Sequence, residues 1–327
     1  MHNKIYLLAI FAAPAIAAFV TLILMSFMLR SSMFSSIQDV PNARSLHDQP
    51  IPRFGGLALM LGVLIGWHFV DKHNVAILFI PVFFLMLLSL LDDLGDLPAK
   101  WRLLVHLLIA IGFVWVAFDG LPFYGTVLLW LGLVWMTNLY NFMDGSNGLA
   151  GGMAVLGFGF YALAAYVQGD SYFALMSLVI VAPSLVFLAF NFGKAKVFMG
   201  DAGSIPLGFL AGAIGLLGWQ KGLWPAWFPV MVFSNFIVDA TATLFKRLLR
   251  GERVWEAHRE HYYQRLIQMG WSHQKTALVE YLLMITFGSV ALLAMNLAIP
   301  YVVFLLTVCI LTILALMHFV DKRWQIE

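Results

Sequence analysis

Residues 75–93 read V-A-I-L-F-I-P-V-F-F-L-M-L-L-S-L-L-D-D, an apolar run that ends in two adjacent carboxylates. A helix needs about 20 apolar residues to cross roughly 30 Å of hydrocarbon, and this run comes close to that length. A charge at the bilayer centre costs about 2.5 to 3.5 kcal/mol on insertion scales. Asp92 and Asp93 are therefore expected where a membrane helix leaves the bilayer.

Similar apolar runs recur along the whole chain of 327 residues, which is 62% hydrophobic, 11% charged and has a mean hydropathy of +0.88. One soluble core cannot hide so much apolar surface, so a membrane is the solvent that fits. We expect an all-α integral membrane protein, a single polytopic domain over 1–327 with about eleven transmembrane helices. The predicted spans are 5–29, 54–70, 75–91, 101–118, 122–140, 147–167, 172–190, 204–219, 225–247, 277–297 and 300–320.

Lysine and arginine are distributed unevenly between the two sides that this topology defines. When each helix-end charge is counted with its adjoining loop, 16 of the 19 basic residues lie on one side. Lys4, Lys72 and Lys221 lie on the other. The positive-inside rule makes the richer side cytoplasmic. The opposite loops are too short to carry a site, so the chemistry is expected on the cytoplasmic face.

Two acidic clusters end apolar helices on this face. Asp92 and Asp93 stand beside Asp96, and although a single aspartate there is as well explained by a solvated helix end, adjacent carboxylates favour a functional role. The second cluster is T-N-L-Y-N-F-M-D-G-S-N-G-L-A from Thr137 to Ala150. In it Asn138, Asn141 and Asp144 recur every three residues and so lie near one helical face. A turn explains the glycines but not the two asparagines.

The segment K-A-K-V-F-M-G-D-A-G-S, from Lys194 to Ser204, places Asp201 directly before another apolar helix. Asp201 or Ser204 as a helix cap is one interpretation. The other is phosphate binding, because amide N–H groups at a helix N-terminus attract anions and Lys194 and Lys196 add positive charge. The residues alone leave both open.

The longest cytoplasmic segment, at about 248–276, contains R-G-E-R-V-W-E-A-H-R-E-H-Y-Y-Q-R-L, which we expect to be an amphipathic helix near the membrane surface. His258 and His261 would then share a face. No cysteine is nearby, and Arg259 and Arg265 suit phosphate better than a metal ion. A basic interfacial helix without a binding role is the alternative.

Asp239 lies in the ninth predicted span, four residues after Asn235 and on the same helical face. We place it near the cytoplasmic end of that span. A buried aspartate in a membrane helix marks either a functional site or a hydrogen-bonded packing contact, and both interpretations remain.

Carboxylates from three separate loops are thus expected to gather on one surface. Like charges brought together in this way repel and need a cation. Oxygen ligands favour Mg²⁺, with Mn²⁺ as a substitute, and Mg²⁺ usually shares its coordination with substrate phosphates. The clustering therefore predicts a phosphate-bearing substrate. The residues concerned are Asp92, Asp93, Asp144 and Asp201.

Five motifs in this order resemble those of the polyprenyl-phosphate N-acetylhexosamine-1-phosphate transferases (glycosyltransferase 4 family), and more narrowly the branch that starts lipopolysaccharide O-antigen chains. The resemblance covers nearly the whole chain. The motifs are P-N-A-R-S-L-H-D-Q-P-I-P-R-F-G-G at 41–56, L-D-D-L-G-D at 91–96, N-L-Y-N-F-M-D-G at 138–145, F-M-G-D-A-G-S at 198–204 and H-R-E-H at 258–261.

The resemblance implies an Mg²⁺-dependent enzyme that moves N-acetylhexosamine 1-phosphate from a UDP-sugar to undecaprenyl (polyprenyl) phosphate. The products would be a polyprenyl-diphosphate-sugar and UMP, and the reaction would initiate O-antigen or another cell-surface glycan. Asp92 and Asp93 would lie near the attacking lipid phosphate, Asp144 would belong to the same catalytic site, and Asp201, helped by Asp93, would bind the metal. Direct attack and a covalent aspartyl intermediate both remain, and we favour direct attack.

Substrate binding is expected from residues that match these motifs or flank them. Some would contact the nucleotide, the sugar or the phosphates, and the loop before Gly56 could close over the site. These residues are Asn138, Asn141, Lys194, Lys196, Asp239, His258, Arg259, His261, Arg44 and His47.

Two departures from the family pattern bear on the substrate. Asn147 stands where many relatives carry a second aspartate, which weakens a metal role there. H-R-E-H replaces three closely spaced histidines, which argues against the peptidoglycan enzyme with its muramoyl-pentapeptide nucleotide. A UDP-N-acetylhexosamine is the better prediction.

The expected partners are the UDP-N-acetylhexosamine, the polyprenyl phosphate and the lipid bilayer, with no nucleic acid, and a homodimer is an open alternative to a monomer. The expected location is the bacterial inner (cell) membrane, as a multi-pass protein with its active site on the cytoplasmic face. The main alternative function is an ion-coupled membrane transporter. Such carriers place polar sites near the midplane, often within repeated halves, and no repeat is apparent in this sequence.

Overall fold

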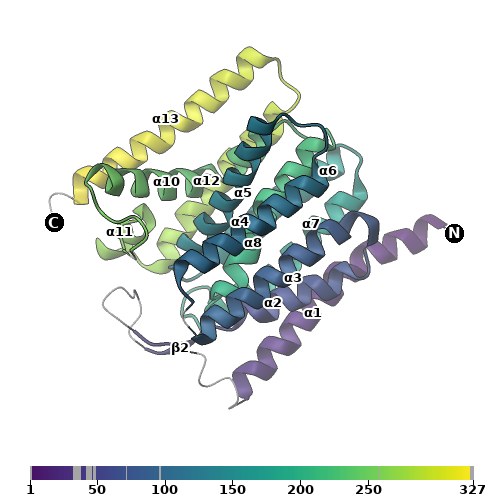
Figure 1. Cartoon of the computed structure of the whole chain (residues 1–327), viewed down its shortest axis with the longest axis horizontal. Helices are drawn as coiled ribbons and strands as arrows, with labels where there is room; N and C mark the ends of the chain where they lie inside the picture. Colours follow the sequence, from purple (N-terminus) through teal and green to yellow (C-terminus); the bar gives the residue numbers. More distant parts are fainter. Residues whose placement is uncertain are drawn as a thin grey trace.

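The computed structural model describes residues 2–31, 38–41, 46, 49–70, 72–95, 97–256 and 258–324. They form a bundle of helices with one short antiparallel strand pair beside it (Figure 1). The elements are α1 (His2–Arg30), β1 (Gln38–Asp39), β2 (Ile51–Pro52), α2 (Gly55–Trp67), α3 (Lys72–Gly95), α4 (Ala99–Ala117), α5 (Phe123–Phe142), α6 (Leu149–Val167), α7 (Ser171–Asn191), α8 (Asp201–Gln220), α9 (Trp227–Val232), α10 (Ser234–Leu249), α11 (Tyr262–Gln268), α12 (His273–Ala294) and α13 (Ile299–Trp324).

The architecture confirms an all-α, multi-pass membrane protein. Within the described residues, nine helices are long and apolar enough to cross a bilayer. The expected number of eleven is not confirmed. The second predicted span is the shorter helix α2, of 13 residues, and the ninth is divided at Phe233 into α9 and α10. An apolar window misses this break because apolar residues continue on both sides of it.

Helix α8 forms the centre of the bundle and is the most deeply buried of the nine spans, whereas α13 is the least buried. Small residues in α8 and in its neighbours let the helices approach closely, as is common where membrane helices pack. A Cβ atom added to Gly208 would lie 2.7 Å from the carbonyl oxygen of Thr137 in α5. A Cβ atom added to Gly56 of α2 would lie 2.3 Å from the Cα of Gly203.

Contacts between loops distinguish the two ends of the bundle. At one end the side chain of Gln220 donates to the carbonyl of Ala117, and Lys221 lies 3.5 Å from Asp170. At the other end the start of α8 meets the ends of α3 and α5 and the strand β2. This second end carries the loops of the predicted aspartates, which are Asp92, Asp93, Asp144 and Asp201.

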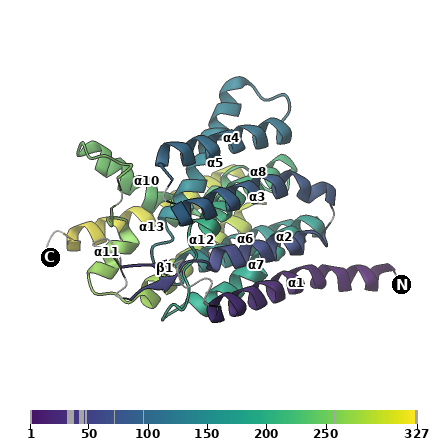
Figure 2. The same ribbon diagram turned by 60° about the horizontal axis from the view of Figure 1, so that its bottom comes forward.

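The stretch after α10 is not the single amphipathic helix that we expected from the sequence. Helix α10 ends at Leu249, and Gly251 has a φ of +75° that a helix cannot continue through. The guanidinium of Arg247 then donates to the backbone carbonyls of Arg253 and Glu256, which holds the chain in turns. Helix resumes only in α11. Figure 2 shows α10 and the turns after it projecting from the bundle.

The close contact between α5 and α8 gives a test of the fold. Gly208→Val should lower the free energy of unfolding by about 1 to 3 kcal/mol or more, because the added methyl groups overlap the α5 backbone. Thermal unfolding in detergent micelles would measure the loss. Gly112→Val is the matched control, since a Cβ at Gly112 meets nothing within 4 Å. Equal melting temperatures for the two variants would contradict this packing.

Candidate active site

The segment before α8 is fixed in place by backbone hydrogen bonds to the start of α2. The amide of Phe198 donates to the carbonyl of Pro52 at 2.7 Å, and the amide of Gly55 donates back to Phe198 at 2.9 Å. Gly200 has a φ of +70°, and a Cβ there would lie 2.5 Å from the carbonyl oxygen of Arg53. Glycine at this position therefore lets the two motifs touch and sets the start of α8.

Asp93 joins α3 to this junction. Its Oδ2 accepts a hydrogen bond from the amide of Ala202 at 3.3 Å, in the first turn of α8, where the helix dipole favours a negative charge. The Nε of Arg53 lies 3.7 Å from Asp93 Oδ1, and Arg53 also donates to the Asp93 carbonyl. Asp93 thus lies between a helix N-terminus and an arginine.

Arg102, in the first turn of α4, bridges two of the predicted aspartates. Its guanidinium lies 2.5 Å from Asp92 Oδ2 and 3.2 Å from Asp201 Oδ2. The other oxygen of Asp92 accepts from the amide of Leu97 at 2.7 Å. Both oxygens of Asp92 are therefore occupied by donors.

The D-G-S-N-G loop brings Asp144 to the same end of the bundle. Asn141, at the end of α5, accepts a hydrogen bond from the hydroxyl of Ser204 at 2.8 Å, which ties α5 to α8. Burial raises the pKa of Asp144 well above its ordinary value, and the nearby charges of Asp201 and Asp93 raise it further. The acidic site thus carries more negative charge than its surroundings stabilise.

The histidine segment, residues His258 to His261, precedes α11 and approaches this site. Asp239, in α10, accepts from the amides of Tyr262 at 2.8 Å and Tyr263 at 3.1 Å and so holds the start of α11. His261 is buried behind the site, with its Nδ1 3.4 Å from Asp239. His258 lies with its ring centre 4.8 Å from that of His261 although no helix joins them.

Burial lowers the pKa of His258 to about 4, and the nearby His261 and Arg247 contribute. At neutral pH the imidazole of His258 is therefore uncharged. Its Nδ1 lies 3.2 Å from the amide of Glu260, which donates to it. Because Nδ1 accepts, Nε2 carries the proton of the neutral ring. It has no hydrogen-bond partner among the described residues and can donate one hydrogen bond to a ligand.

Two cavities adjoin at this end of the bundle. The larger has a volume of about 340 Å³ and the smaller about 190 Å³. Arg53, Asp93 and Asp201 line both and form the wall between them. The larger is also lined by Asp39, Leu46, Asn141, Phe142, Asp144, Gly145, Ser146, Asn147, Asn191, Phe198, Gly200, His258, Tyr263, Gln264 and His273, and the smaller by Asp92, Leu97 and Arg102.

The structure brings many of the predicted residues together and separates others. Those that line a cavity are Asp92, Asp93, Asn141, Asp144, Asp201 and His258. Within the described part of the chain, the predicted residues that lie outside both cavities are Asn138, Lys194, Lys196, Asp239, Arg259 and His261. Arg44, His47 and Asp96 lie outside the described residues.

The residues that lie outside both cavities either have other contacts or are exposed. Asp239 is saturated by donors from α10 and α11, which matches the packing alternative considered for it. Asn138 donates to the carbonyl of Val134, in its own helix. Lys194, Lys196 and Arg259 are exposed.

Several cavity residues were not singled out from the sequence. Arg53 lies inside the P-R-F-G-G motif, and Arg102 follows the acidic pair by one short loop, so both carried a signal. His273 carried none. Its Nδ1 lies 2.9 Å from the Ser146 hydroxyl and its Nε2 3.1 Å from the carbonyl of Leu46. Since Nε2 must donate to that carbonyl, Nδ1 accepts from Ser146.

The carboxylates of the site suit a magnesium ion, but they do not form a complete coordination shell by themselves. Among the described residues, no group of three or more Asp, Glu, His or Cys side chains is arranged to hold a metal. Mg²⁺ does not need such a cage, since it is usually held by one or two carboxylates together with waters and substrate phosphates. Asp144 and Asp201, whose charges repel in one cavity, offer carboxylates of this kind.

Comparison with known proteins identifies relatives over most of the chain. A model of glycosyl transferase family 4 matches residues 75–218. A Bacillus subtilis protein described as a probable undecaprenyl-phosphate N-acetylglucosaminyl 1-phosphate transferase is 30% identical over 98% of this chain and 95% of its own length. An undecaprenyl-phosphate alpha-N-acetylglucosaminyl 1-phosphate transferase of Yersinia pestis is 28% identical, over 72% of this chain and 71% of its own length. A phospho-N-acetylmuramoyl-pentapeptide-transferase of Staphylococcus saprophyticus is also 28% identical, over 84% and 94%.

The raised pKa of Asp144 gives a pH-dependent prediction. Because folding favours the protonated carboxyl, ionisation of Asp144 opposes folding as the pH rises toward the folded-state pKa, while below about pH 4 both states are protonated. Asp144→Asn should therefore raise the melting temperature at about pH 8, without divalent cations, and leave it nearly unchanged at about pH 4. The exposed Asp119 provides the control variant Asp119→Asn. An equal shift at both pH values would contradict the burial of this charge.

Proposed function

This chain belongs to the polyprenyl-phosphate N-acetylhexosamine-1-phosphate transferases of glycosyl transferase family 4, and we propose that it transfers N-acetylhexosamine 1-phosphate from a UDP-sugar to polyprenyl phosphate. An oxygen of the lipid phosphate attacks the phosphorus that carries the sugar. The bond from that phosphorus to the bridging oxygen breaks, and UMP leaves. The lipid diphosphate-sugar keeps the sugar–oxygen bond intact.

The observation that carries this proposal is the shared wall of the two cavities. Two anionic substrates must meet, and Arg53, Asp93 and Asp201 face both spaces. We place the UDP-sugar in the larger cavity, whose volume falls in the range typical of small-molecule sites. The lipid phosphate enters the smaller one, between Arg53 and Arg102, because guanidinium groups bind phosphate oxygens bidentately. The reacting phosphorus then lies at the wall.

The hydrogen bonds distinguish the roles of the two adjacent aspartates. Both oxygens of Asp92 are engaged, by Arg102 and by the amide of Leu97, so this side chain positions the arginine. Asp93 faces both cavities, and the hydrogen bond that it accepts from the Ala202 amide is longer, at 3.3 Å. Asp93 therefore orients the attacking phosphate and removes its proton when that phosphate is monoprotonated.

The proposal includes a magnesium ion, because the clustered carboxylates and the substrate phosphates are the oxygen ligands that Mg²⁺ prefers. Asp201, with Asp93 or Asp144, would hold Mg²⁺ or Mn²⁺. The ion, when bound, would neutralise charge on the pyrophosphate. Arg53 and Arg102 perform a similar task for the acceptor phosphate, because they supply fixed positive charge where two anions approach.

The donor sugar is proposed to be a UDP-N-acetylhexosamine. His258, Tyr263, Gln264 and His273 offer hydrogen-bonding groups to the larger cavity. Two of the relatives are named for N-acetylglucosaminyl 1-phosphate transfer, and another for a muramoyl-pentapeptide. The H-R-E-H sequence supports the simpler sugar. Contacts from Arg44, His47, Lys194, Lys196 and Arg259 remain predictions.

We further propose that the reaction takes place on the cytoplasmic face of the bacterial inner membrane. The charge asymmetry supports this orientation, since the cavities lie at the end of the bundle where the basic residues gather. The product would start an O-antigen or another cell-surface glycan. A homodimer stays a prediction. A carrier is less well supported, because its polar site is expected near the midplane.

The released nucleotide tests the reaction directly. Purified protein supplied with polyprenyl phosphate, Mg²⁺ and UDP-N-acetylglucosamine should release UMP. Asp201→Asn should lower kcat by about 10² or more, as expected for loss of charge stabilisation at the reacting centre. This variant should still fold, as a cooperative thermal unfolding transition would show. Asp119→Asn should retain full turnover. Release of UDP would indicate an ordinary glycosyltransferase. If no nucleotide were released, the ion-coupled transporter would be the better interpretation.

The two aspartates should differ in their kinetic effects. Asp93→Asn should lower kcat by about 10² or more, as expected for loss of a general base. Asp92→Asn weakens the hold on Arg102, so its main effect should be a higher KM for polyprenyl phosphate. Steady-state kinetics with each substrate varied would separate the two. The same loss of kcat in both variants, with KM unchanged, would refute this division of roles.

A further inference from the structure

A third cavity lies away from the acidic site, between the cytoplasmic ends of α10, α11 and α13. Its volume is about 460 Å³, and it shares no lining residue with the two cavities described above. Figure 1 shows these three elements close to the C-terminus. The cavity is lined by Lys246, Arg250, Glu260, Arg265, His318, Asp321, Lys322 and Trp324.

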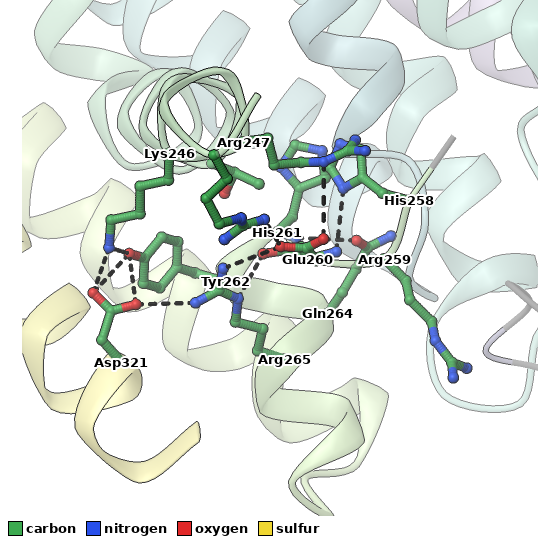
Figure 3. Close-up of polar contacts among 12 residues, drawn as sticks. Lys246, Arg247, His258, Arg259, Glu260, His261, Tyr262, Gln264, Arg265 and Asp321 are labelled. Carbon is green, nitrogen blue, oxygen red and sulfur yellow. Dashed lines mark hydrogen bonds and ion pairs between the residues drawn. The ribbon is translucent and has the colours of Figure 1, made fainter. Parts of the chain in front are cut away.

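Positive charge exceeds negative charge in this lining, since four lysines and arginines face two carboxylates. Asp321 is already shared between Lys246 at 2.5 Å, Arg265 at 2.9 Å and the hydroxyl of Tyr262 (Figure 3). Glu260 lies 2.5 Å from Arg250. Both carboxylates are thus engaged by cations. Arg250 also pairs with Glu252, outside the lining, at 2.5 Å. Among the described residues, the positive excess therefore rests on Lys246 and Arg265, which share one carboxylate, and on Lys322, and an added anion would offset it.

Two cationic or titratable side chains face the cavity without a partner. Within the part of the chain that is described, neither Lys322 nor His318 forms a hydrogen bond or an ion pair, and both are exposed. The guanidinium of Arg265, by contrast, is buried and held in place, with its Cζ 5.7 Å from the ring centre of Trp324. The cavity therefore combines one fixed arginine with ammonium and imidazole groups that are free to bind.

The position along α13 places this cavity at the membrane surface. Leu314, Leu316 and Phe319 are exposed and apolar, and Asp321 to Trp324 follow them directly. A change from exposed apolar to basic and aromatic residues at a helix end is typical of the boundary between hydrocarbon and headgroups. A molecule in the cavity would lie beside lipid, with the apolar side of α13 next to it.

We propose that this cavity binds the phosphate of an anionic phospholipid headgroup from the cytoplasmic leaflet. Basic pockets between membrane helices on the cytoplasmic side bind such headgroups, and arginine suits the phosphate geometry. The acyl chains lie along the exposed apolar residues of α13. A soluble phosphate has the same charge chemistry but gains nothing from this apolar surface. The inference rests on charge and position alone and does not depend on the proposed reaction.

The bound lipid would also stabilise the position of the histidine segment. Arg265 donates to the carbonyl of Glu260 at 2.7 Å, and the amide of Glu260 donates to His258. The headgroup cavity and the acidic site are therefore attached to opposite ends of one short piece of chain. Anionic lipid should raise the melting temperature of the protein.

Lipid binding to the purified full-length protein tests the proposal. Native mass spectrometry in a neutral detergent, with added phosphatidylglycerol or phosphatidylcholine, should show clear preference for phosphatidylglycerol. Each cation near the surface contributes a factor of about five, so Lys322→Gln should weaken phosphatidylglycerol binding about fivefold and Arg250→Gln with Lys322→Gln about 25-fold. Lys275→Gln, in α12 and outside this lining, should leave the preference unchanged.

Three results would overturn the proposal. Equal binding of the two lipids would remove the charge requirement. Full retention of phosphatidylglycerol by Lys322→Gln and by the double variant would place the lipid elsewhere. Stabilisation by inorganic phosphate that is lost in these variants, with no lipid preference, would make the site one for a soluble anion. Because the single variant changes an exposed lysine without a partner, it keeps the test valid if the double variant does not fold.

Discussion

The structure depends on the meeting of two chain segments, Pro52 to Gly56 and Phe198 to Gly203, at the N-terminal end of α8. Backbone hydrogen bonds and the near contact of Gly56 with Gly203 fix this junction. It places the N-terminus of α8 against Asp93, and it brings Arg53 beside the same carboxylate. The wall between the two cavities exists only because these backbones approach so closely, and a side chain at either glycine would force them apart.

Charge balance then explains why the site can collect anions. Carboxylates from α3, the loop after α5 and the start of α8 share a small volume, and Arg53 and Arg102 compensate part of their charge. Burial raises the pKa of Asp144 well above its ordinary value, and the remaining repulsion from Asp201 and Asp93 raises it further. A site of this kind has fixed positive groups for phosphates and spare negative charge for a cation. The cationic cavity near α13 has the opposite balance, and α11 lies between the two.

The helical membrane architecture could be predicted from the sequence because apolar length and charge asymmetry are properties of single segments. The meeting of Asp92, Asp93, Asp144 and Asp201 followed from the alternation of spans, which needs no knowledge of packing. The break at Phe233 could not be predicted, because apolar residues continue on both sides of it. The turns after Gly251 could not be predicted either, since they depend on side-chain hydrogen bonds from Arg247 to the carbonyls of Arg253 and Glu256. His273 reaches the site by the tertiary packing of α12, for which local sequence gives no sign.

The most direct test of the central claim is an experimental structure with both substrates in place. Cryo-electron microscopy of the protein with UDP-N-acetylglucosamine and an unreactive phosphonate analogue of polyprenyl phosphate would locate the two anionic groups. Our account requires the pyrophosphate in the larger cavity, the phosphonate between Arg53 and Arg102, and Asp93 and Asp201 between them. A phosphonate bound outside the smaller cavity, or a nucleotide away from Asp201, would contradict it.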